Sequence, residues 1–317
     1  MAEQNYDVII VGAGPAGLTA AIYTSRRALK TLVISKDVGG QLALTDDVEN
    51  YPGFNTIGGL ELSQKFQEQA AKTGVEFLFE GAEKITKDGN NFLLETSTGK
   101  KLGARTIILC FGLTPRTLDV PGEKELTGRG VSYCATCDGP LYRGKNVVVV
   151  GGGNSALDAA EYSSKLAKKV YMLVRKDAFR GEQVLIDHVN NAENVEIIFN
   201  AAAKEVKGTD RVEKLVYETA DGQQKEIEVE GIFVEIGHVA KTGWLDNLGL
   251  DMTNRKEIII SRDNETNIKG IFAAGDITDI TYKQAVISAG EGSKAALQAY
   301  KYLQGDKPIV PDWTPKK

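Results

Sequence analysis

The sequence is poor in the residues that bind metals and cross-link secreted folds. Its 317 residues include three cysteines and two histidines, so it lacks the dense cysteine framework of small secreted proteins. A structural zinc site needs four ligands. Beside Cys134 and Cys137 the chain offers only Cys110, His188 and His238, and none of them repeats a metal-binding spacing. We therefore predict that the chain holds no metal.

Excess charge of one sign and long apolar runs are also missing. The chain has 38 basic and 43 acidic residues, a net charge of −5, which gives no basic surface for nucleic acid. The chain contains no run of about 18 apolar residues, so no membrane span is predicted. The polar, acidic N-terminal residues are unlike a signal peptide. We expect a cytoplasmic protein in which a cysteine pair would cycle between oxidised and reduced forms.

The chain does contain a Cys-x-x-Cys pair followed directly by an acid, namely Cys134, Cys137 and Asp138. This spacing suits either a small disulfide ring or half of a metal site, and beside βαβ units it favours redox chemistry. The thiolate pKa in such motifs can fall to about 7 or below. Asp138 lies where a carboxylate can exchange a proton with a nascent thiolate.

A first glycine-rich loop follows a buried strand predicted over residues 6–11 and precedes a helix predicted to about residue 27. Gly12 permits the tight turn, Gly14 lets the backbone approach a pyrophosphate, and Gly17 lets the helix pack against the strand. The free N–H groups at the helix start point at phosphates. This setting predicts a dinucleotide site.

A second fingerprint, G-x-G-x-x-A over residues 151–156, follows a strand predicted over 146–150 and precedes a helix predicted over 155–167. Two fingerprints in two strand–turn–helix settings are more specific than one. The sequence therefore predicts an α/β protein with two Rossmann-like, three-layer nucleotide-binding domains, the second inserted in the first. We place the domains at residues 1–115 with 245–317, and at 116–244.

Cations follow the strand predicted over residues 170–174. A cofactor with a free 2′-hydroxyl favours an acid there, whereas this chain has Arg175 and Lys176, with Arg180 just beyond. Cations at this place suit a 2′-phosphate, which arginine can bind with two donors. A solvated basic loop is the alternative, because Asp177 dilutes the cluster. We favour NADPH and leave NADH open.

Polar residues also follow the strand predicted near residue 272. Asp276 can accept a hydrogen bond from a ribityl hydroxyl, and a long helix is predicted from Lys283 to about residue 303, whose start can stabilise negative charge on a reduced flavin ring. The other titratable groups have structural interpretations. We expect Cys110 to be a core residue, His188 to lie on a helix surface, and His238 to be a structural loop residue.

At this point the chain resembles the bacterial low-molecular-weight thioredoxin reductases, which are flavoproteins of the pyridine nucleotide-disulphide oxidoreductase class. The resemblance covers almost the whole chain and is specific because the motifs occur in combination. They are residues 12–17, Gly39-Gly40-Gln41-Leu42, Val48-Glu49-Asn50-Tyr51-Pro52-Gly53, Cys134 to Gly139, residues 151–156, Phe233-Val234-Glu235-Ile236-Gly237-His238, and Ala274-Gly275-Asp276.

The resemblance implies FAD in the split domain and NADPH in the inserted one. The implied FAD residues are Gly12, Gly14, Pro15, Ala16, Gly17, Gly40, Gln41, Asn50, Asp276, Lys283, Gln284 and Ala285. The implied NADPH residues are Gly151, Gly153, Asn154, Ser155, Ala156, Arg175, Lys176 and Arg180. Electrons are expected to pass from NADPH through FAD and the Cys134–Cys137 disulfide to oxidised thioredoxin, with Asp138 as the acid. The family is homodimeric, and it rotates the inserted domain on two connecting strands, which we place near residues 114–118 and 242–246.

The chain departs from the family pattern at the phosphate motif. Val174-Arg175-Lys176 stands where the family usually has His-Arg-Arg, and the proline expected after Gly237-His238 is absent. Other stretches resemble the flavoprotein of alkyl hydroperoxide reductase, which commonly prefers NADH. The alternative function is thus an NADH-dependent or ferredoxin-linked flavin reductase serving another protein disulfide. The intact second glycine loop argues against ferredoxin. A nucleotide-binding sensor without turnover is disfavoured by two cofactor loops and a Cys-x-x-Cys pair.

Overall fold

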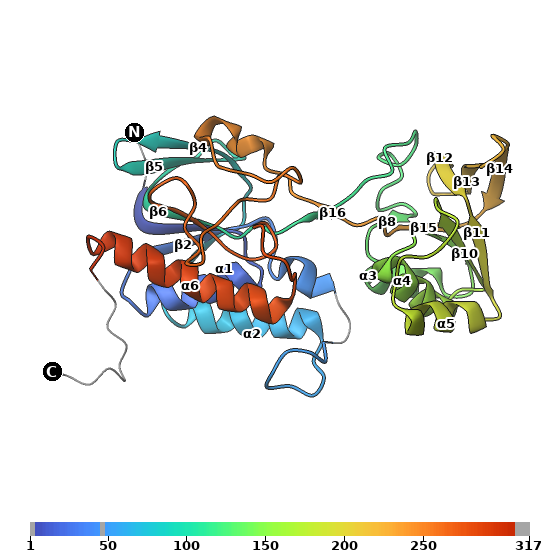
Figure 1. Ribbon diagram of the computed structural model, residues 1–317, viewed down its shortest axis with the longest axis horizontal. Helices are drawn as coiled ribbons and strands as arrows, with labels where there is room; N and C mark the ends of the chain where they lie inside the picture. The colour runs from blue at the N-terminus through green and yellow to red at the C-terminus, as the bar shows by residue number, and fades with distance from the viewer. Residues whose placement is uncertain (1–3, 45–47, 308–317) are drawn as a thin grey trace. The chain divides into compact units, whose positions relative to one another are not determined.

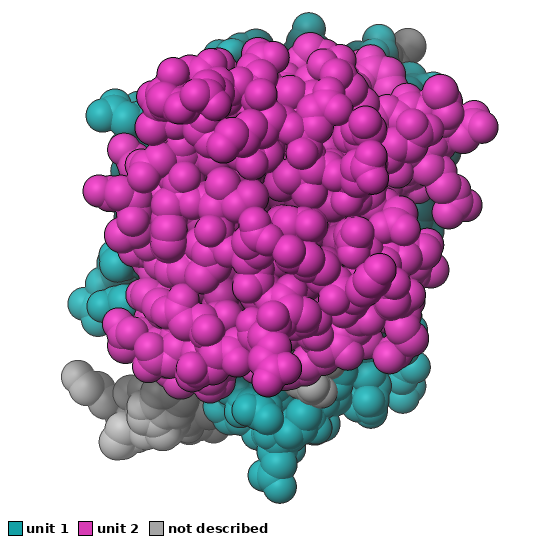
Figure 2. Space-filling model, turned by 90° about the vertical axis from the view of Figure 1, so that its right-hand side faces the viewer, with its two compact units in different colours: residues 1–113, 240–317 teal, residues 114–239 magenta. Residues whose placement is uncertain are grey.

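The computed structural model describes residues 4–44 and 48–307. The chain divides into two compact units, residues 1–113 with 240–317 and residues 114–239, coloured separately in Figure 2. These limits lie two residues (113 against 115) and five residues (239 against 244) before the boundaries placed from the sequence. No helix in the described ranges is long and apolar enough to cross a membrane.

The first unit, formed by residues 1–113 and 240–317, is built on a seven-stranded sheet of order β3-β2-β1-β6-β5-β4, with β17 paired to β6. The strands β1, β2, β3, β6 and β17 are parallel, and β4 and β5 form an antiparallel hairpin. The strands are β1 Gln4–Val11, β2 Thr31–Ile34, β3 Glu76–Leu78, β4 Ala82–Asp88, β5 Asn91–Thr96, β6 Lys101–Leu109 and β17 Ile271–Ala273.

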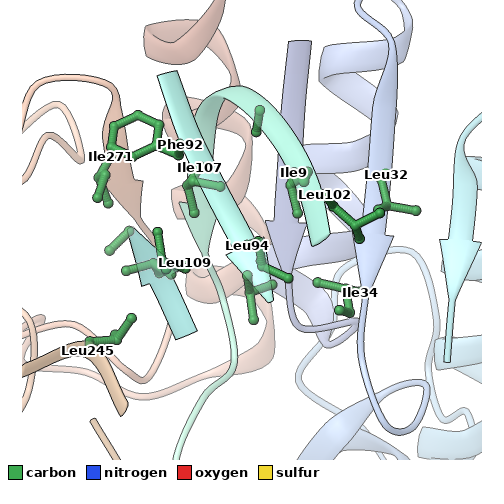
Figure 3. Packing of buried hydrophobic residues seen from close by; sticks show 14 of the residues in the cluster. Ile9, Leu32, Ile34, Phe92, Leu94, Leu102, Ile107, Leu109, Leu245 and Ile271 are labelled. Carbon is green, nitrogen blue, oxygen red and sulfur yellow. The ribbon is translucent and has the colours of Figure 1, made fainter. Parts of the chain in front are cut away.

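Three helices cover one face of this sheet (Figure 1): α1 Pro15–Ser25, α2 Gly59–Ala71 and α6 Ala285–Leu303. Alternation along β1 explains the layers, because Val8 and Ile10 pack with α1 and α6. Ile9 points to the other face, where it joins Leu94 of the hairpin and Leu245 of the 3₁₀ helix η3 Gly243–Leu248 (Figure 3). Burial on both faces accounts for the continuous apolar run from Val8 to Val11 in β1.

The second unit, residues 114–239, contains a five-stranded parallel sheet of order β11-β10-β9-β15-β8. Val147 and Val149 of β9 pack on the helical side, whereas Val148 and Val150 pack against an antiparallel three-stranded meander, β12 to β14. The elements are β8 Val131–Ser132, α3 Ala135–Asp138, η2 Gly139–Tyr142, β9 Asn146–Val150, α4 Asn154–Ser164, β10 Lys169–Val174, α5 Gln183–Asn191, β11 Val195–Phe199, β12 Ala201–Lys207, β13 Lys214–Thr219, β14 Gln224–Glu228 and β15 Gly231–Val234.

The two chain segments that enter and leave the second unit pair with each other. β7 Thr114–Pro115 is antiparallel to β16 His238–Val239, and the Arg116 N–H donates to the Gly237 carbonyl at 2.9 Å. The prediction of two connecting strands is confirmed, but the second strand does not lie at residues 242–246, where η3 begins instead. His238 consequently lies in a strand rather than a loop. Two-residue strands have no sequence period, so only their pairing reveals them.

Candidate functional site

Cys134 and Cys137 form a disulfide with a Cα–Cα distance of 5.4 Å. Cys134 is the N-cap of α3, and its Sγ accepts a hydrogen bond from the Cys137 N–H at 3.2 Å. The Ser132 hydroxyl accepts from the Cys134 N–H at 3.1 Å and fixes the turn. Cys137 is exposed and Cys134 is partly buried. Since N–H groups at a helix start stabilise a thiolate, the arrangement suits a disulfide that opens and closes.

Asp138 ends α3 directly after the disulfide and is partly buried. Its charge is felt by Tyr142 in the following turn: burial, and secondarily Asp138, raises the pKa of the Tyr142 phenol. The acid predicted from the sequence therefore lies in the same helical turn as Cys137.

A buried carboxylate that was not predicted from the sequence anchors the residue before the disulfide. Glu123 is 4% exposed and accepts hydrogen bonds from the N–H groups of Leu118 and Asp119 and from the Tyr133 hydroxyl at 2.9 Å. Burial and this carboxylate raise the pKa of Tyr133 to about 12. An acid directly after the Pro121-Gly122 turn is the sequence signal that could have marked it.

A second carboxylate that was not predicted, Glu235, follows β15 and contacts both chemical motifs of its unit. The Ala135 N–H, next to Cys134, favours the charged form of its side chain. Its main-chain N–H donates to Val150 at 2.8 Å, beside the second glycine loop. Burial raises the pKa of Glu235 to about 7; the Ala135 N–H opposes this shift and the Asp158 carboxylate adds to it. The signal was an acid within an otherwise apolar strand end.

In the first glycine loop, Gly12 and Gly17 are closely packed, whereas Gly14 has open space beside it. A Cβ on Gly12, which has a φ of +108°, would lie 2.4 Å from the Cys110 carbonyl oxygen, and one on Gly17 would lie 1.9 Å from the Gly12 oxygen. A Cβ on Gly14 would meet only the Gly39 oxygen, at 3.7 Å. The protein itself therefore leaves room at Gly14, where the fingerprint reserves space for a pyrophosphate.

Two distant segments come to this loop. A Cβ on Gly292 of α6 would lie 2.0 Å from the Ala16 oxygen, so α6 crosses α1 closely. The Ser288 hydroxyl of α6 donates to Asp276 at 3.1 Å. Gly275 lies against Ala16, so the Asp276 loop adjoins the start of α1. Pro15 and Ala16 open that helix.

Residues predicted to hold the flavin also meet around the start of α6. The Asn50 amide donates to the Gln284 side chain at 3.1 Å, across 234 residues of chain. The Gln41 amide donates to the Leu113 carbonyl at 3.3 Å, and Gly40 begins the 3₁₀ helix η1 Gly40–Leu44. Ala285 is the first residue of α6. The structure thus brings these sequence-predicted residues to the carboxyl edge of the parallel strands.

The Lys283 side chain makes its contacts within the protein. Its ammonium donates to the main-chain oxygens of Asp276 and Thr278 and forms an ion pair with Glu257 at 3.2 Å. Its charge is thus directed into the protein, where it holds the loop that carries Asp276.

In the second glycine loop, as in the first, one glycine is closely packed and another has open space beside it. Gly151 has a φ of +149°, and a Cβ there would lie 2.2 Å from the Glu235 oxygen, whereas one on Gly153 would meet nothing within 4 Å. The Asn154 side chain is tied to Glu182, whose N–H donates to it at 2.8 Å. Ser155 is exposed, and Ala156 is buried beneath the loop. The residues at Gly151 and Gly153 fit a dinucleotide as those of the first loop do.

The three predicted cations lie beside this loop and are exposed. The Arg180 N–H donates to the Gly152 carbonyl at 2.7 Å, so the main chain joins Arg180 to the glycine loop. Arg175 lines a cavity of about 220 Å³, with Asn200 held by the Lys176 carbonyl at 3.0 Å. Within the described ranges, Arg175, Lys176 and Arg180 make no ion pair, so they can bind an anion.

The remaining titratable groups confirm their structural interpretations. Cys110 is 5% exposed, and burial strongly raises the pKa of its thiol. His188 lies exposed on α5, with Nδ1 3.0 Å from a Glu161 oxygen. Among residues 4–44 and 48–307, no group of three or more His, Cys, Asp or Glu side chains could hold a metal.

Comparison with known proteins gives consistent relatives. The model of the pyridine nucleotide-disulphide oxidoreductase family matches residues 6–292. The chain is 42% identical over 306 residues to thioredoxin reductase of Bacillus subtilis, covering 95% of this chain and 96% of that protein. It is 40% identical to a subunit of the alkyl hydroperoxide reductase of Escherichia coli, covering 94% of this chain but 58% of that one. In structure it is similar to Lactococcus lactis thioredoxin reductase, with a TM-score of 0.86, 36% identity, and 95% and 99% of the two chains covered.

The family match spans most of the chain, and the B. subtilis relative is similar over nearly its full length. The predicted α/β fold is confirmed by the structural similarity. The chain therefore belongs to the pyridine nucleotide-disulphide oxidoreductase family.

Proposed function

We propose that the protein is a thioredoxin-disulfide reductase that uses NADPH and FAD. The observation that carries this proposal is the Cys134–Cys137 disulfide at the start of α3, in a unit that also has its own glycine loop. Relatives named thioredoxin reductase cover nearly the whole chain in sequence and in structure. An oxidoreductase needs both a nucleotide site and an electron acceptor, and this unit supplies both.

We assign FAD to the first unit. The start of α1 at Pro15 directs main-chain N–H groups towards phosphates, Asp276 offers a carboxylate for a ribityl hydroxyl, and the Asn50–Gln284 pair closes the site. When bound there, a flavin would supply two-electron transfer between the nicotinamide and the protein disulfide. The protein's own part is to hold, orient and shield this group.

NADPH is assigned to the second unit. Gly153 leaves the backbone open to a pyrophosphate at the start of α4, and Gly151 makes the tight turn before it. Arg175, Lys176 and Arg180 offer positive charge for a 2′-phosphate. The ribbon of β7 and β16 is the proposed hinge between the two domains, since element ends absorb such motion. NADH remains the alternative donor because a lysine and a valine replace two residues of the usual phosphate motif.

The reduced cysteine pair then reduces the partner by exchange. One thiolate attacks a sulfur of the partner disulfide, which breaks that bond, releases the partner's other sulfur as a thiolate and forms a mixed disulfide. The second cysteine then displaces the partner's remaining sulfur as a thiolate and restores the Cys134–Cys137 bond. We assign to Asp138, which lies in the same helical turn as Cys137, the exchange of the proton that one cysteine loses and the leaving thiolate gains. The electrons that leave the pair equal the two that the partner takes up.

The assembly and location belong to the same proposal. Large apolar side chains lie exposed on the segments near the Asn50–Gln284 bond, Phe54, Tyr282 and Val286, and on the first turn of α2, Leu60. They offer apolar area for a homodimer, which light scattering after gel filtration would measure. A redox-cycling disulfide fits a cytoplasmic location, where thiols are kept reduced.

An anaerobic titration of the purified protein with NADPH, and separately with NADH, tests the cofactor assignments through the flavin absorbance. We expect bleaching by NADPH at much lower concentration. A preference for NADH would support the alkyl hydroperoxide reductase-like alternative, although this chain spans only 58% of that relative's length. A colourless protein, or no bleaching by either nucleotide, would contradict the proposal.

The disulfide is tested by Cys134→Ser and Cys137→Ser. Each variant should lose thioredoxin reduction by more than about a thousandfold, because exchange needs both sulfurs, while NADPH still bleaches the flavin. Cys110→Ala is the matched control and should retain turnover, since Cys110 is a buried free thiol outside the pair. Thioredoxin turnover in both single variants would refute the role of this pair.

A further inference from the structure

Glu123 is a buried carboxylate that joins the entry of the second unit to the turn before the disulfide. It is 4% exposed, and its two oxygens accept three hydrogen bonds. The N–H groups of Leu118 and Asp119 donate to it at 2.7 and 2.8 Å, and the Tyr133 hydroxyl donates at 2.9 Å. The first two residues follow strand β7, and Tyr133 directly precedes Cys134. One side chain thus connects two segments that are apart in the sequence.

The turn that carries this carboxylate is fixed by packing against β12. Gly122 has a φ of +80°, and a Cβ there would lie 1.9 Å from the Val206 oxygen. The Val206 N–H donates to the Pro121 carbonyl at 2.9 Å. Leu118 and Tyr133 pack on the same apolar core as this strand. The carboxylate therefore has little freedom to follow a partner that moves.

The charge of Glu123 and the backbone it holds indicate more than a space-filling role. A buried carboxylate is costly unless it is paired or hydrogen-bonded. Within residues 4–44 and 48–307 it makes no ion pair, so N–H and O–H donors hold its charge. Asp119, which it holds, has a φ of +57°. Strain of this kind persists where the surroundings fix a segment, and it concentrates at functional sites.

The disulfide turn is also tied to the other strand of the β7–β16 ribbon. Ser132 of β8 pairs with Phe233 of β15, and the Ser132 hydroxyl accepts the Cys134 N–H at 3.1 Å. Along the chain β15 leads into β16, which pairs with β7. Cys134 is therefore connected to β16 through the sheet and to β7 through Glu123.

We propose that Glu123 is a positioning residue for the Cys134–Cys137 disulfide. By holding the chain after β7 to the residue before Cys134, it fixes the disulfide relative to the ribbon. The inference rests on the proposed function, which supplies the flavin and makes this ribbon the hinge. A turn about the ribbon then presents the disulfide to the flavin in one orientation, and orientation of this kind lowers a reaction barrier.

The step that should depend on Glu123 is electron transfer into the disulfide. In that step the S–S bond breaks, and the two sulfurs take up two electrons and two protons, which the reduced flavin and solvent supply. Misplacement of reacting groups by about 1 Å can slow a reaction about a hundredfold. The preceding step, flavin reduction by NADPH, uses the second glycine loop, where Gly151 packs against Glu235. Changes at Glu123 should therefore slow the second step alone.

Rapid anaerobic mixing of the flavin-loaded, oxidised protein with one equivalent of NADPH tests this dependence. Flavin absorbance reports the first step, and thiols counted after acid quenching report the second. Tyr133→Phe removes one donor and should slow thiol formation about threefold. Glu123→Gln leaves an N–H of Leu118 or Asp119 without its acceptor and should slow it about tenfold or more. Flavin bleaching should keep its rate, so reduced flavin should accumulate in both variants.

Further measurements separate positioning from a general loss of structure. The KM for NADPH and the equilibrium between the cysteine pair and thioredoxin should be unchanged in both variants. Tyr217→Phe removes the hydroxyl of a buried tyrosine of the same core, and Glu125→Gln changes an exposed acid close to Glu123. Both control variants should form thiols at the wild-type rate.

Thiol formation at the wild-type rate in Glu123→Gln and Tyr133→Phe would overturn the inference and leave the proposed function standing. An equal slowing of flavin bleaching, or a shifted equilibrium with thioredoxin, would also overturn it, because the effect would not be one of position. If Glu123→Gln fails to fold, which thermal unfolding would show, Tyr133→Phe decides. A wild-type protein that forms no thiols with either NADPH or NADH would overturn the proposed function, and this inference with it.

Discussion

The glycine loops of the two units have the same local packing but different surrounding elements. In each, the first glycine packs against the residue that follows a neighbouring strand, Gly12 against Cys110 and Gly151 against Glu235. The N–H groups of Cys110 and Glu235 donate to the strands that precede their loops, at 2.7 and 2.8 Å. Among the described residues, only the first unit has a long helix, α6, across the helix that follows its glycine loop. At Gly292 the two helices are so close that a Cβ on this residue would contact the Ala16 main chain.

This difference separates a permanent site from an exchanging one. The first loop lies beneath α6, the Asp276 loop and the Asn50–Gln284 pair, which suits a tightly held prosthetic group. The second loop leaves Asn154 and Ser155 exposed beside exposed cations, which suits a nucleotide that enters and leaves at each turnover. The same local fingerprint thus serves two kinds of binding, and the surrounding elements decide which.

The largest difference between the two loops is expected when the third conserved position of the fingerprint is changed to alanine. The second loop already has Ala156 there, but Gly17→Ala should destabilise the first unit by more than about 3 kcal/mol, because a Cβ 1.9 Å from the Gly12 oxygen forces the backbone apart. Thermal unfolding measures the loss. The matched variant Gly14→Ala has room in the protein and should fold but purify without flavin. Normal flavin content in both would contradict the assigned roles.

A smaller effect is expected from Gly153→Ala in the open loop. A Cβ there meets nothing in the protein within 4 Å, so folding and flavin content should be unchanged. The KM for NADPH should rise about tenfold or more, since about 1.4 kcal/mol of binding energy is lost for each factor of ten. Gly290→Ala in α6, which also has open space at its Cβ, is the control and should leave KM unchanged. An unaltered KM in Gly153→Ala would place the nucleotide elsewhere.

Removing one cation should affect only the phosphorylated nucleotide. Arg175→Ala should weaken NADPH about tenfold and leave NADH unchanged, because the guanidinium has no ion-pair partner in the described chain and is available to a 2′-phosphate. The ratio of kcat/KM for NADPH and NADH is the measurement. Arg129→Ala, an exposed arginine of the same unit, should keep the wild-type ratio. Equal losses with both nucleotides would mean that Arg175 contacts a group they share.

The smallest effect concerns Cys110, the counterpart of Glu235 in the first unit. Burial raises the pKa of its thiol, so little thiolate exists at neutral pH. In the oxidised native protein, a thiol reagent should modify almost no cysteine within minutes, and in the reduced protein it should modify two quickly. The third should react only after unfolding. Rapid reaction of three thiols in the reduced native protein would show that Cys110 is accessible.

Local sequence patterns were sufficient for most elements of the parallel sheets. Residues 146–150 form a strand with the predicted bounds, and the strand predicted over 170–174 is observed over Lys169–Val174, because buried parallel strands are continuous apolar runs between turns. β12 was not predicted, since its alanines and lysines have no strand pattern and it forms by pairing with β13. The position of the two-residue β16 was not predicted either, because this strand forms by pairing with β7.

The sequence by itself determined the chemistry: two nucleotide fingerprints, a Cys-x-x-Cys pair and an acid beside it. Glycine loops and redox pairs can be read locally because each needs particular residues at fixed spacing. Only the tertiary structure joined Asn50 to Gln284, tied Arg180 to the second loop and packed Glu235 against Gly151. These contacts depend on where distant segments cross, and no local pattern encodes such crossings.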